Sequence, residues 1–406
     1  MTQYDRNLVK RPTSGEAPFG LEEIFFSRTN ERGILQSGNE VFRRVSHFSW
    51  QELIGAPHKI VRHPDMPKGV FQLFWDTIQR GQHIGAYVKN QSKDGLSYWV
   101  YAVVIPCEGG FVSVRIKPTS ELFEKVKQAY SQLLSAETTE ALTPEDRRAL
   151  LLAWVTELGF DGYDHFATVA LQEELSQREA GLGRESKEIS TNLKGAFEDA
   201  TALTSETQGL VSDFSAMRTI PHNLRVIASR IEPAGGPVTV LSQNYGSMSR
   251  NMSEWFEANV IGPDRNFSKL KELVNTSGFV QGMVKVLVEC EQQFQTEGQT
   301  GLETGIGAEL ELLSDLSNKQ IVLSNVGLQE VHYEASRIIT ACQTMQRHIL
   351  GLSSTRVLCK IESARLPESG ETLSEIIDQL GAFQERIMNR LEKIITLCGR
   401  IKTETS

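Results

Sequence analysis

The chain has 406 residues, enough for roughly two or three domains, and a formal net charge of −9. An acidic chain without a Lys/Arg-rich stripe is not typical of nucleic-acid binding, so no nucleic-acid partner is expected. The five cysteines are scattered and show none of the spacings that hold zinc or attach haem. This usage favours reduced thiols in a cytosolic protein.

The sequence shows neither a signal peptide nor a membrane span. Residues 1–5 lack the apolar stretch of a signal peptide. The most apolar stretches, Ala149–Val155 and Phe279–Val288, are far shorter than the roughly 20 residues that a membrane-spanning helix needs. We therefore expect a soluble, cytoplasmic protein.

As far as residue 120, aromatic and β-branched residues cluster between Gly, Asn and Asp turns, which is typical of strands joined by hairpins. Strands are expected at residues 23–28, 34–36, 86–89, 96–104 and 111–116. Short helices are expected at residues 39–45, 49–53 and 70–80. Two strands, a few short helices and three further strands indicate an α+β domain.

The most unusual motif is the run Val61–Pro67, which reads Val-Arg-His-Pro-Asp-Met-Pro and is followed by Trp75. Each proline fixes its own φ and keeps the preceding residue out of the helical region, so the run should be a stiff, extended loop. A stiff loop that carries Arg62, His63 and Asp65 can hold planar or anionic groups in place.

Residues 11–119 resemble a PAS domain and, within that family, the PAS domain of bacterial aerotaxis receptors. The resemblance runs through Asn39 and Phe42, Ser49–Gly55, Pro57-His58, the Arg62–Lys68 loop, Phe71, Trp75, Val88–Asn90, Tyr98–Val100 and Arg115. It implies a five-stranded antiparallel sheet with short helices. It also implies non-covalent binding of FAD and a role in reading the redox or oxygen state of the cell.

On this resemblance, the candidate residues for the flavin site are Asn39, His58, Arg62, His63, Asp65, Trp75, Asn90 and Trp99. The asparagine carboxamides offer both the donor and the acceptor that flavin carbonyl groups and ring nitrogens need. Arg62 offers a charge-assisted fork for phosphate, and Trp75 a surface for the ring system. Asp65 would orient His63 or Arg62, or bond a ribityl hydroxyl. The sequence indicates no metal site.

Other interpretations of these residues stay open. Trp75 and Trp99 also suit a hydrophobic core, and Arg62 with Asp65 suits a salt bridge that only shapes the loop. A haem cofactor needs an axial histidine, which His58 or His63 would supply. A flavin–cysteinyl photoreceptor is disfavoured because the domain's only cysteine, Cys107, stands at a strand end.

From residue 120 onward the pattern is almost entirely helical. A helical linker is expected over residues 120–183, with breaks at Thr143-Pro144 and at residues 159–162. A heptad-like apolar run from Ile189 to Ile231 stops at Pro233–Pro237 and is followed by a return helix, which predicts a first long hairpin over residues 184–260. A second hairpin or bundle is expected over residues 264–403, ending in an apolar seam from Leu373 to Ile401. The fold class is therefore an α+β PAS domain followed by an all-α region of long helical hairpins or coiled coil.

The first hairpin weakly resembles the cytoplasmic tip of methyl-accepting chemotaxis receptors. The resemblance rests on Asn223-Leu224 and Ile231-Glu232, which precede a Gly turn and an apolar return helix. Pro221 and the turn Pro233–Pro237 depart from that family's pattern. The resemblance implies a histidine kinase and its coupling protein as partners. The apolar seams, together with the habit of PAS proteins to dimerise, predict a homodimer.

No catalytic motif is present: the sequence has no Walker A, GxSxG or HExxH motif, and no kinase-like His box followed by nucleotide-binding motifs. We therefore expect a sensor and not an enzyme, with PAS-bound FAD reading redox or oxygen state and helical hairpins relaying the signal. The alternatives are an interaction scaffold whose PAS fold has no ligand, and a haem-binding PAS sensor. A flavin enzyme would need a substrate pocket and proton-transfer groups, and the sequence offers no candidates for them.

Overall fold

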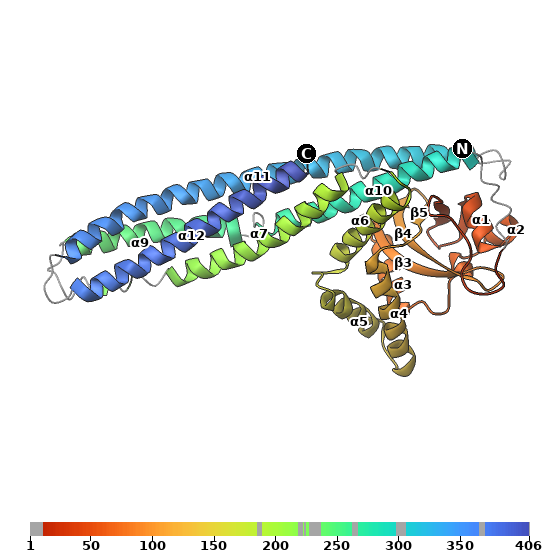
Figure 1. The fold of residues 1–406 in the computed structure, drawn as a ribbon, viewed down its shortest axis with the longest axis horizontal. Coiled ribbons are helices and arrows are strands. Elements are labelled where there is room, and N and C mark those ends of the chain that lie inside the picture. The colour runs from red at the N-terminus through yellow and green to blue at the C-terminus, as the bar shows by residue number, and fades with distance from the viewer. Residues whose placement is uncertain are drawn as a thin grey trace. The chain divides into compact units, whose positions relative to one another are not determined.

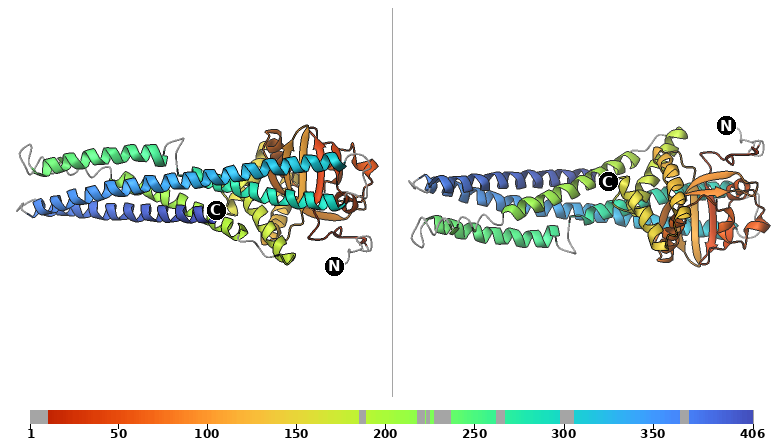
Figure 2. Two further views of the ribbon diagram at one scale, coloured as in Figure 1. Left: turned by 90° about the horizontal axis from the view of Figure 1, so that it is seen from above. Right: turned by 90° about the horizontal axis from the view of Figure 1, so that it is seen from below.

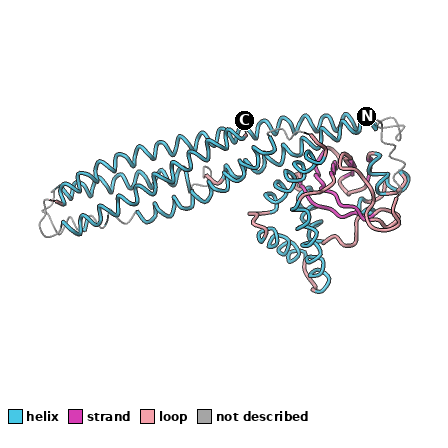
Figure 3. The backbone as a smooth tube through the Cα atoms, in the orientation of Figure 1, coloured by secondary structure: helices cyan, strands magenta, loops and turns pink. Residues whose placement is uncertain are grey.

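The computed structural model describes residues 11–184, 189–217, 222, 225–226, 237–261, 267–297, 306–364 and 370–405. The chain divides into two compact units. Unit 1 consists of Met1–Thr191 and Asn275–Val326, and unit 2 of Asn192–Val274 and Gly327–Ser406. All strands in the described part of the chain lie in unit 1, and unit 2 is helical (Figure 3).

The sheet of unit 1 contains β1 (Phe25–Asn30), β2 (Leu35–Gly38), β3 (Ile84–Gln91), β4 (Ser97–Cys107) and β5 (Gly110–Ile116). Their order is β2-β1-β5-β4-β3, and each neighbouring pair is antiparallel. The predicted five-stranded antiparallel sheet is therefore confirmed. Alternate residues of each strand face opposite sides of this sheet, which separates a cavity side from an outer side.

The helices between β2 and β3 cover the cavity side of the sheet (Figure 1). They are α1 (Glu40–Ser46), α2 (Trp50–Leu53), the 3₁₀ turn η1 (His58–Val61) and α3 (Lys68–Gln79). Arg62 follows η1 in an extended conformation, with φ −73° and ψ 127°, and Pro67 caps α3. The predicted stiff loop is therefore short and lies between a 3₁₀ turn and a helix.

Three helices follow the sheet: α4 (Glu121–Thr139), α5 (Pro144–Glu157) and α6 (Tyr163–Gly181). Tyrosine hydroxyls connect the outer side of the sheet to α6: the Tyr101 hydroxyl donates to the Ala167 carbonyl at 2.6 Å, and the Tyr163 hydroxyl donates to the Gly85 carbonyl at 3.2 Å. These contacts fasten α6 across β3 and β4. The two predicted breaks coincide with the ends of α5.

The long helices α10 (Lys269–Glu297) and α11 (Ile306–Ser363) contribute their unit 1 segments to the outer side of β1, where the two segments lie side by side (Figure 2). The Gln293 side chain accepts from the Ile24 N–H at 2.8 Å and donates to the Ile24 carbonyl at 2.9 Å. Glu309 pairs with Arg28 at 2.6 Å. Helices thus cover the sheet on both sides. The predicted domain boundaries stay predictions.

Unit 2 contains α7 (Ile189–Met217), α9 (Pro237–Phe256), α12 (Gly370–Glu404) and the remaining parts of α10 and α11. A short π-helical turn, η2 (Glu257–Ile261), continues α9. The apolar core draws on all of these long helices, as shown by Leu210, Met252, Leu270, Ile338 and Leu391, each at most 1% exposed. The described parts of the predicted apolar seams, from Phe197 to Phe214 and from Leu373 to Ile401, therefore contribute to a core within a single chain.

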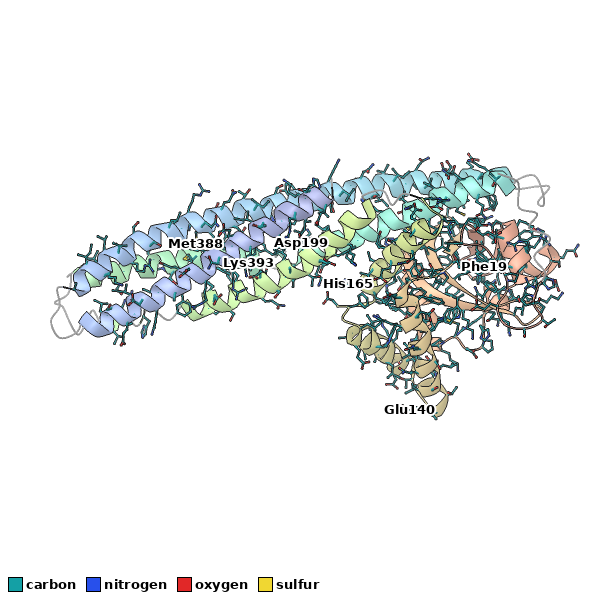
Figure 4. All side chains as sticks on the ribbon, viewed as in Figure 1. Phe19, Glu140, His165, Asp199, Met388 and Lys393 are labelled. Carbon is teal, nitrogen blue, oxygen red and sulfur yellow. The ribbon has the colours of Figure 1, made fainter. Side chains whose placement is uncertain are left out.

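Charged side chains set the pairing of α7 with α12. The pairs are Asp199–Arg400 at 2.5 Å, Glu206–Lys393 at 3.2 Å and Asp213–Arg390 at 2.6 Å. The acidic residues are spaced by seven, and their partners run in the opposite direction along α12, so the two helices form an antiparallel heptad pair. Figure 4 labels Asp199 and Lys393 on these two helices.

None of the helices in the described ranges is long and apolar enough to cross a membrane. The residues that carry the chemotaxis-receptor resemblance, Pro221, Asn223-Leu224 and Ile231–Gly236, lie outside the described residues.

Candidate functional site

Unit 1 holds a cavity of ≈ 370 Å³ between the sheet and the helices of its cavity side. Ligand pockets in proteins typically occupy about 300–1,000 Å³, so the volume suits a ligand or part of one. The strands contribute Thr29, Val88, Asn90, Ala102, Val104, Phe111, Ser113 and Arg115 to its walls. The connecting segments contribute Arg32, Gly33, Pro57, His58, Lys59, Arg62, Phe71, Phe74, Trp75 and Ile78.

Aromatic side chains form the apolar part of the cavity. Trp75 meets Phe111 edge to face, with ring centroids 5.9 Å apart. Gly33 lies under Trp75 with φ +73°, and a Cβ at this position would stand 2.7 Å from the indole ring. A glycine is therefore needed both for the backbone conformation and for the approach of the tryptophan. Such a slot suits a flat, conjugated ring.

The polar centre of the cavity is Arg115, on β5. Arg115 as a whole is only 3% exposed to solvent. The Nη2 group donates to Ser27 Oγ at 2.5 Å and to His58 Nε2 at 2.7 Å, whereas Nη1 is buried without a hydrogen-bond partner. Burial lowers the pKa of Arg115 to about 10, so it is still charged at neutral pH. Within the described residues no carboxylate pairs with it, which is costly for a buried cation.

His58, the first residue of η1, is the acceptor for Arg115. Burial and then the charge of Arg115 lower the pKa of His58 to about 3, so the ring is neutral at physiological pH. Because arginine can only donate, Nε2 of His58 must be the unprotonated nitrogen. The imidazole stacks on Phe42 with centroids 6.0 Å apart and planes 8° from parallel.

Arg62 and Asn90 also border the cavity and are joined by an isolated bridge between their backbones. The Arg62 guanidinium lies 3.7 Å from the Phe71 ring centroid, and burial lowers its pKa. Neither side chain has a hydrogen-bond or ion-pair partner among the described residues. Both are therefore available to a ligand.

His63 and Asp65 lie in the same loop but not on the cavity wall. His63 Nδ1 accepts from the Asp65 N–H at 3.0 Å, and Asp65 pairs with Lys89 at 2.7 Å. The hydrogen bond from Lys89 lowers the pKa of Asp65. The salt bridge that shapes the loop is thus between Asp65 and Lys89, whereas the sequence had suggested Arg62 as the partner.

The two other candidates also lie off the cavity wall. Asn39 caps α1: its Oδ1 accepts from the Phe26 and Phe42 N–H groups at 2.9 and 3.2 Å, and its Nδ2 donates to the Ile24 carbonyl at 2.7 Å. Trp99 lies on the outer side of the sheet. There it packs against Phe123 and Tyr130 of α4, with centroids 5.4 and 6.0 Å apart.

The structure therefore brings together four of the predicted residues, His58, Arg62, Trp75 and Asn90. Arg115 is part of the family resemblance but is not among the site residues predicted from the sequence. A signal was present: in the strand Phe111–Ile116, the polar residues Ser113 and Arg115 recur at every second position beside a core otherwise apolar. Arg32 and Lys59, at the cavity mouth, had no comparable signal.

This domain is similar to known proteins. Residues 37–113 match a family model described as PAS fold. Over 135 residues the chain is 35% identical to the aerotaxis receptor of Escherichia coli (strain K12), covering 32% of this chain and 27% of the receptor. The chain thus spans about a quarter of the length of the curated relative that it matches.

Solved structures also match the domain. A PAS domain from Colwellia psychrerythraea is 17% identical and covers 24% of this chain and 86% of its own, with a TM-score of 0.21. The blue-light photoreceptor Aureochrome1 LOV is 18% identical and covers 30% and 93%, with a TM-score of 0.22. Residues 37–113 of this chain therefore have the PAS fold, in agreement with the five-stranded antiparallel sheet. Within that fold, the sequence is similar to that of the aerotaxis receptor.

Asn39 and Asn90 are equally buried, at 3% exposed, yet differ in role, which gives a matched pair of variants. Asn39→Ala leaves buried backbone groups unpaired and removes the cap of α1, so we expect a loss of about 2–4 kcal/mol in unfolding free energy. Asn90→Ala, which breaks no hydrogen bond in the ligand-free protein, should cost less than about 1 kcal/mol. Urea titration of both ligand-free variants measures this difference, and equal losses would contradict it.

The neutral state of His58 predicts a pH effect on the ligand-free protein. Unfolding frees a histidine that binds a proton near its ordinary pKa of 6.5, whereas the folded protein resists protonation until about 3. Stability is therefore lost as the pH falls from 6.5 toward 3. His58→Gln should lose less over this range, since its side chain does not titrate. Melting temperatures of both proteins at steps between pH 7 and 4 test this, and parallel curves would count against it.

Proposed function

We propose that this protein is a cytoplasmic redox- or oxygen-sensing signal transduction protein whose PAS domain binds FAD non-covalently. The observation that carries this proposal is that Arg115, whose buried Nη1 has no hydrogen-bond partner, lines a cavity that has aromatic side chains in its walls. The aerotaxis-receptor type of the domain adds support, since the PAS subfamily that the sequence resembles binds FAD.

The residues present fit this cofactor. The ring system would lie in the slot beside Trp75, with the Asn90 carboxamide and Arg115 facing its polar edge. A cavity of ≈ 370 Å³ suits the ring and part of the ribityl chain, so the phosphates would lie at the mouth. Arg32, Lys59 and Arg62 line the cavity and form no ion pair among the described residues, although Glu137 acts on Arg62 from a distance; three cations here favour a phosphate ligand. Bound FAD would supply the reversible electron chemistry.

The alternatives fit less well. A haem would need an axial histidine, but His58 Nε2 already accepts from Arg115, and His63 does not border the cavity. Cys107, at the end of β4, does not border the cavity, so no cysteinyl adduct is proposed. A ligand-free scaffold leaves the buried Arg115 without compensation.

Flavin analysis of the full-length chain tests the cofactor. The whole chain is used because α4, α6 and α10 cover the outer side of the sheet. Protein purified and then denatured should release stoichiometric FAD on chromatography. No flavin, or haem in its place, would overturn the proposal. Two variants locate the site: Trp75→Phe should lower FAD occupancy, whereas Trp99→Phe, on the opposite side of the sheet, should not.

Signal relay is the second part of the proposal. Glu174 of α6 is fully buried and accepts from the Tyr87 hydroxyl at 2.9 Å, from the Thr119 N–H at 2.6 Å and from the Ser120 hydroxyl at 2.5 Å. Tyr87 belongs to β3, the strand of Asn90, and Ser120 caps α4. Glu174 thus ties the ligand-bearing strand to the first helix of the all-α region. A conformational change in β3 would therefore alter the Glu174 contacts that hold the start of α4.

We propose a chemotaxis-type kinase and its coupling protein as partners, because part of this chain is similar to a receptor. A homodimer is also proposed. Because the seams of α7 and α12 are buried within one chain, a dimer must use other surfaces.

Hydrogen exchange tests the relay. Reduction with dithionite should change protection in residues 117–140 of the FAD-bound protein, because a changed β3 pulls on Glu174 and on the start of α4. Glu174→Gln weakens the acceptor and should reduce this change, whereas Glu157→Gln, exposed on α5, should leave it intact. Identical protection in the oxidised and reduced wild-type protein would mean that this relay does not operate.

A further inference from the structure

We propose that Arg115 is the residue that positions the flavin ring and favours its reduced form over its oxidised form. This inference rests on the proposed function and deepens it, because it assigns the redox preference of the site to one side chain. Dithionite, in this setting, is oxidised to sulfite while the ring is reduced. The reduced ring then carries an additional negative charge, unless it takes up a proton from solvent.

The first support is the position of the guanidinium. Arg115 lies on the cavity side of β5, two residues after Ser113, and both side chains border the cavity. Its exposed fraction is 3%. A cation at this depth acts on a ligand with little screening by water, so its effect on ring charge is large. Arg62 also borders the cavity, but it is only half-buried. Its guanidinium lies 3.7 Å from the Phe71 ring centroid, whereas that of Arg115 lies 5.3 Å from the Phe42 ring centroid.

The second support is the unequal use of its two terminal nitrogens. Nη2 is held by Ser27 and His58, at 2.5 and 2.7 Å, whereas Nη1 has no partner. Both partners of Nη2 are neutral, so the site fixes the guanidinium without cancelling its charge. A buried N–H donor without an acceptor destabilises the folded protein. A ligand oxygen that accepts a hydrogen bond from Nη1 would remove this penalty.

His58 acts as a positioning residue in this arrangement. A carboxylate at the same place would hold Arg115 equally well but would neutralise it. Neutral imidazole holds the guanidinium through Nε2 and leaves the positive charge to the ligand. The stacking of His58 on Phe42 keeps the imidazole from turning away.

The test uses the full-length protein stripped of flavin and reloaded with FAD, and compares Arg115→Gln with the control Arg28→Gln. Arg28 lies on β1, on the outer side of the sheet, where Glu309 pairs with it. Arg115→Gln should weaken FAD binding by about 10- to 100-fold, the usual effect of losing a hydrogen bond to a charged group. The preference for reduced over oxidised flavin should fall by about tenfold or more, seen as a lower midpoint potential. Arg28→Gln should change neither quantity.

Thermal melting separates this role from a structural one. If Arg115 serves the ligand, Arg115→Gln should reduce the rise in melting temperature that FAD produces and change the ligand-free value little. If it only holds the fold together, the ligand-free value falls, while the rise with FAD and the midpoint potential stay at the wild-type level; that result overturns the inference. Should Arg115→Gln fail to fold, Arg115→Lys carries the test. It keeps the charge but loses the planar fork, so FAD affinity should fall while the midpoint potential stays closer to wild type.

Failure of the inference and failure of the proposed function give different results. Wild-type protein that binds no flavin refutes the proposed function and this inference together. Wild-type protein that binds FAD, with Arg115→Gln equal to it in affinity and midpoint potential, refutes only the role of Arg115.

Discussion

The structure of unit 1 depends on a sheet that is buried on both sides. Every residue of β5 is buried, and so is most of β4, so each side needs a cover. The two covers differ in kind. On the outer side, tyrosine hydroxyls and the Gln293 carboxamide bond directly to backbone groups of the sheet and its flanks. On the cavity side, aromatic rings meet edge to face and leave an open slot. The space for a ligand is therefore on the cavity side, whereas the outer side is bonded to helices.

The buried charges of the PAS domain and its outer cover differ in how they are compensated. Arg178 donates to Glu289 and to two backbone carbonyls, and Glu174 accepts from several donors. Arg115, on the wall of the cavity, is buried and charged, and its Nη1 has no hydrogen-bond partner. Such a local cost persists where a site is prepared for something else. The surrounding scaffold, with Asn39 bonding three backbone groups at the edge of the sheet, supplies the compensating stability.

The sequence predicted the elements well because local signals determine them: Gly and Asp turns bound the strands, and Thr143-Pro144 starts α5 in a capping box. It predicted the site less well, because the side of the sheet on which a side chain lies depends on the register of its strand. Trp99 pairs with Lys89, one residue from Asn90, and this single step puts the indole on the outer side. Asn39 precedes a helix, where asparagine is as often a cap as a ligand group. The outer cover by residues of α10 and α11 could not be predicted, since long-range docking leaves no periodic trace in the sequence.

The helices α10 and α11 carry this docking into the all-α region by covalent continuity. Each has one part in unit 1 and the other in unit 2, and the division in α11 falls at Val326 and Gly327. Glycine is among the weakest helix formers, so the helix is least resistant to bending at that point. Gln293 and Glu309, which bind the β1 region, lie on the same two helices that enter the core of unit 2 through Leu270 and Ile338. The link between the sheet of unit 1 and the core of unit 2 is therefore covalent, because the same two helices contribute residues to both units.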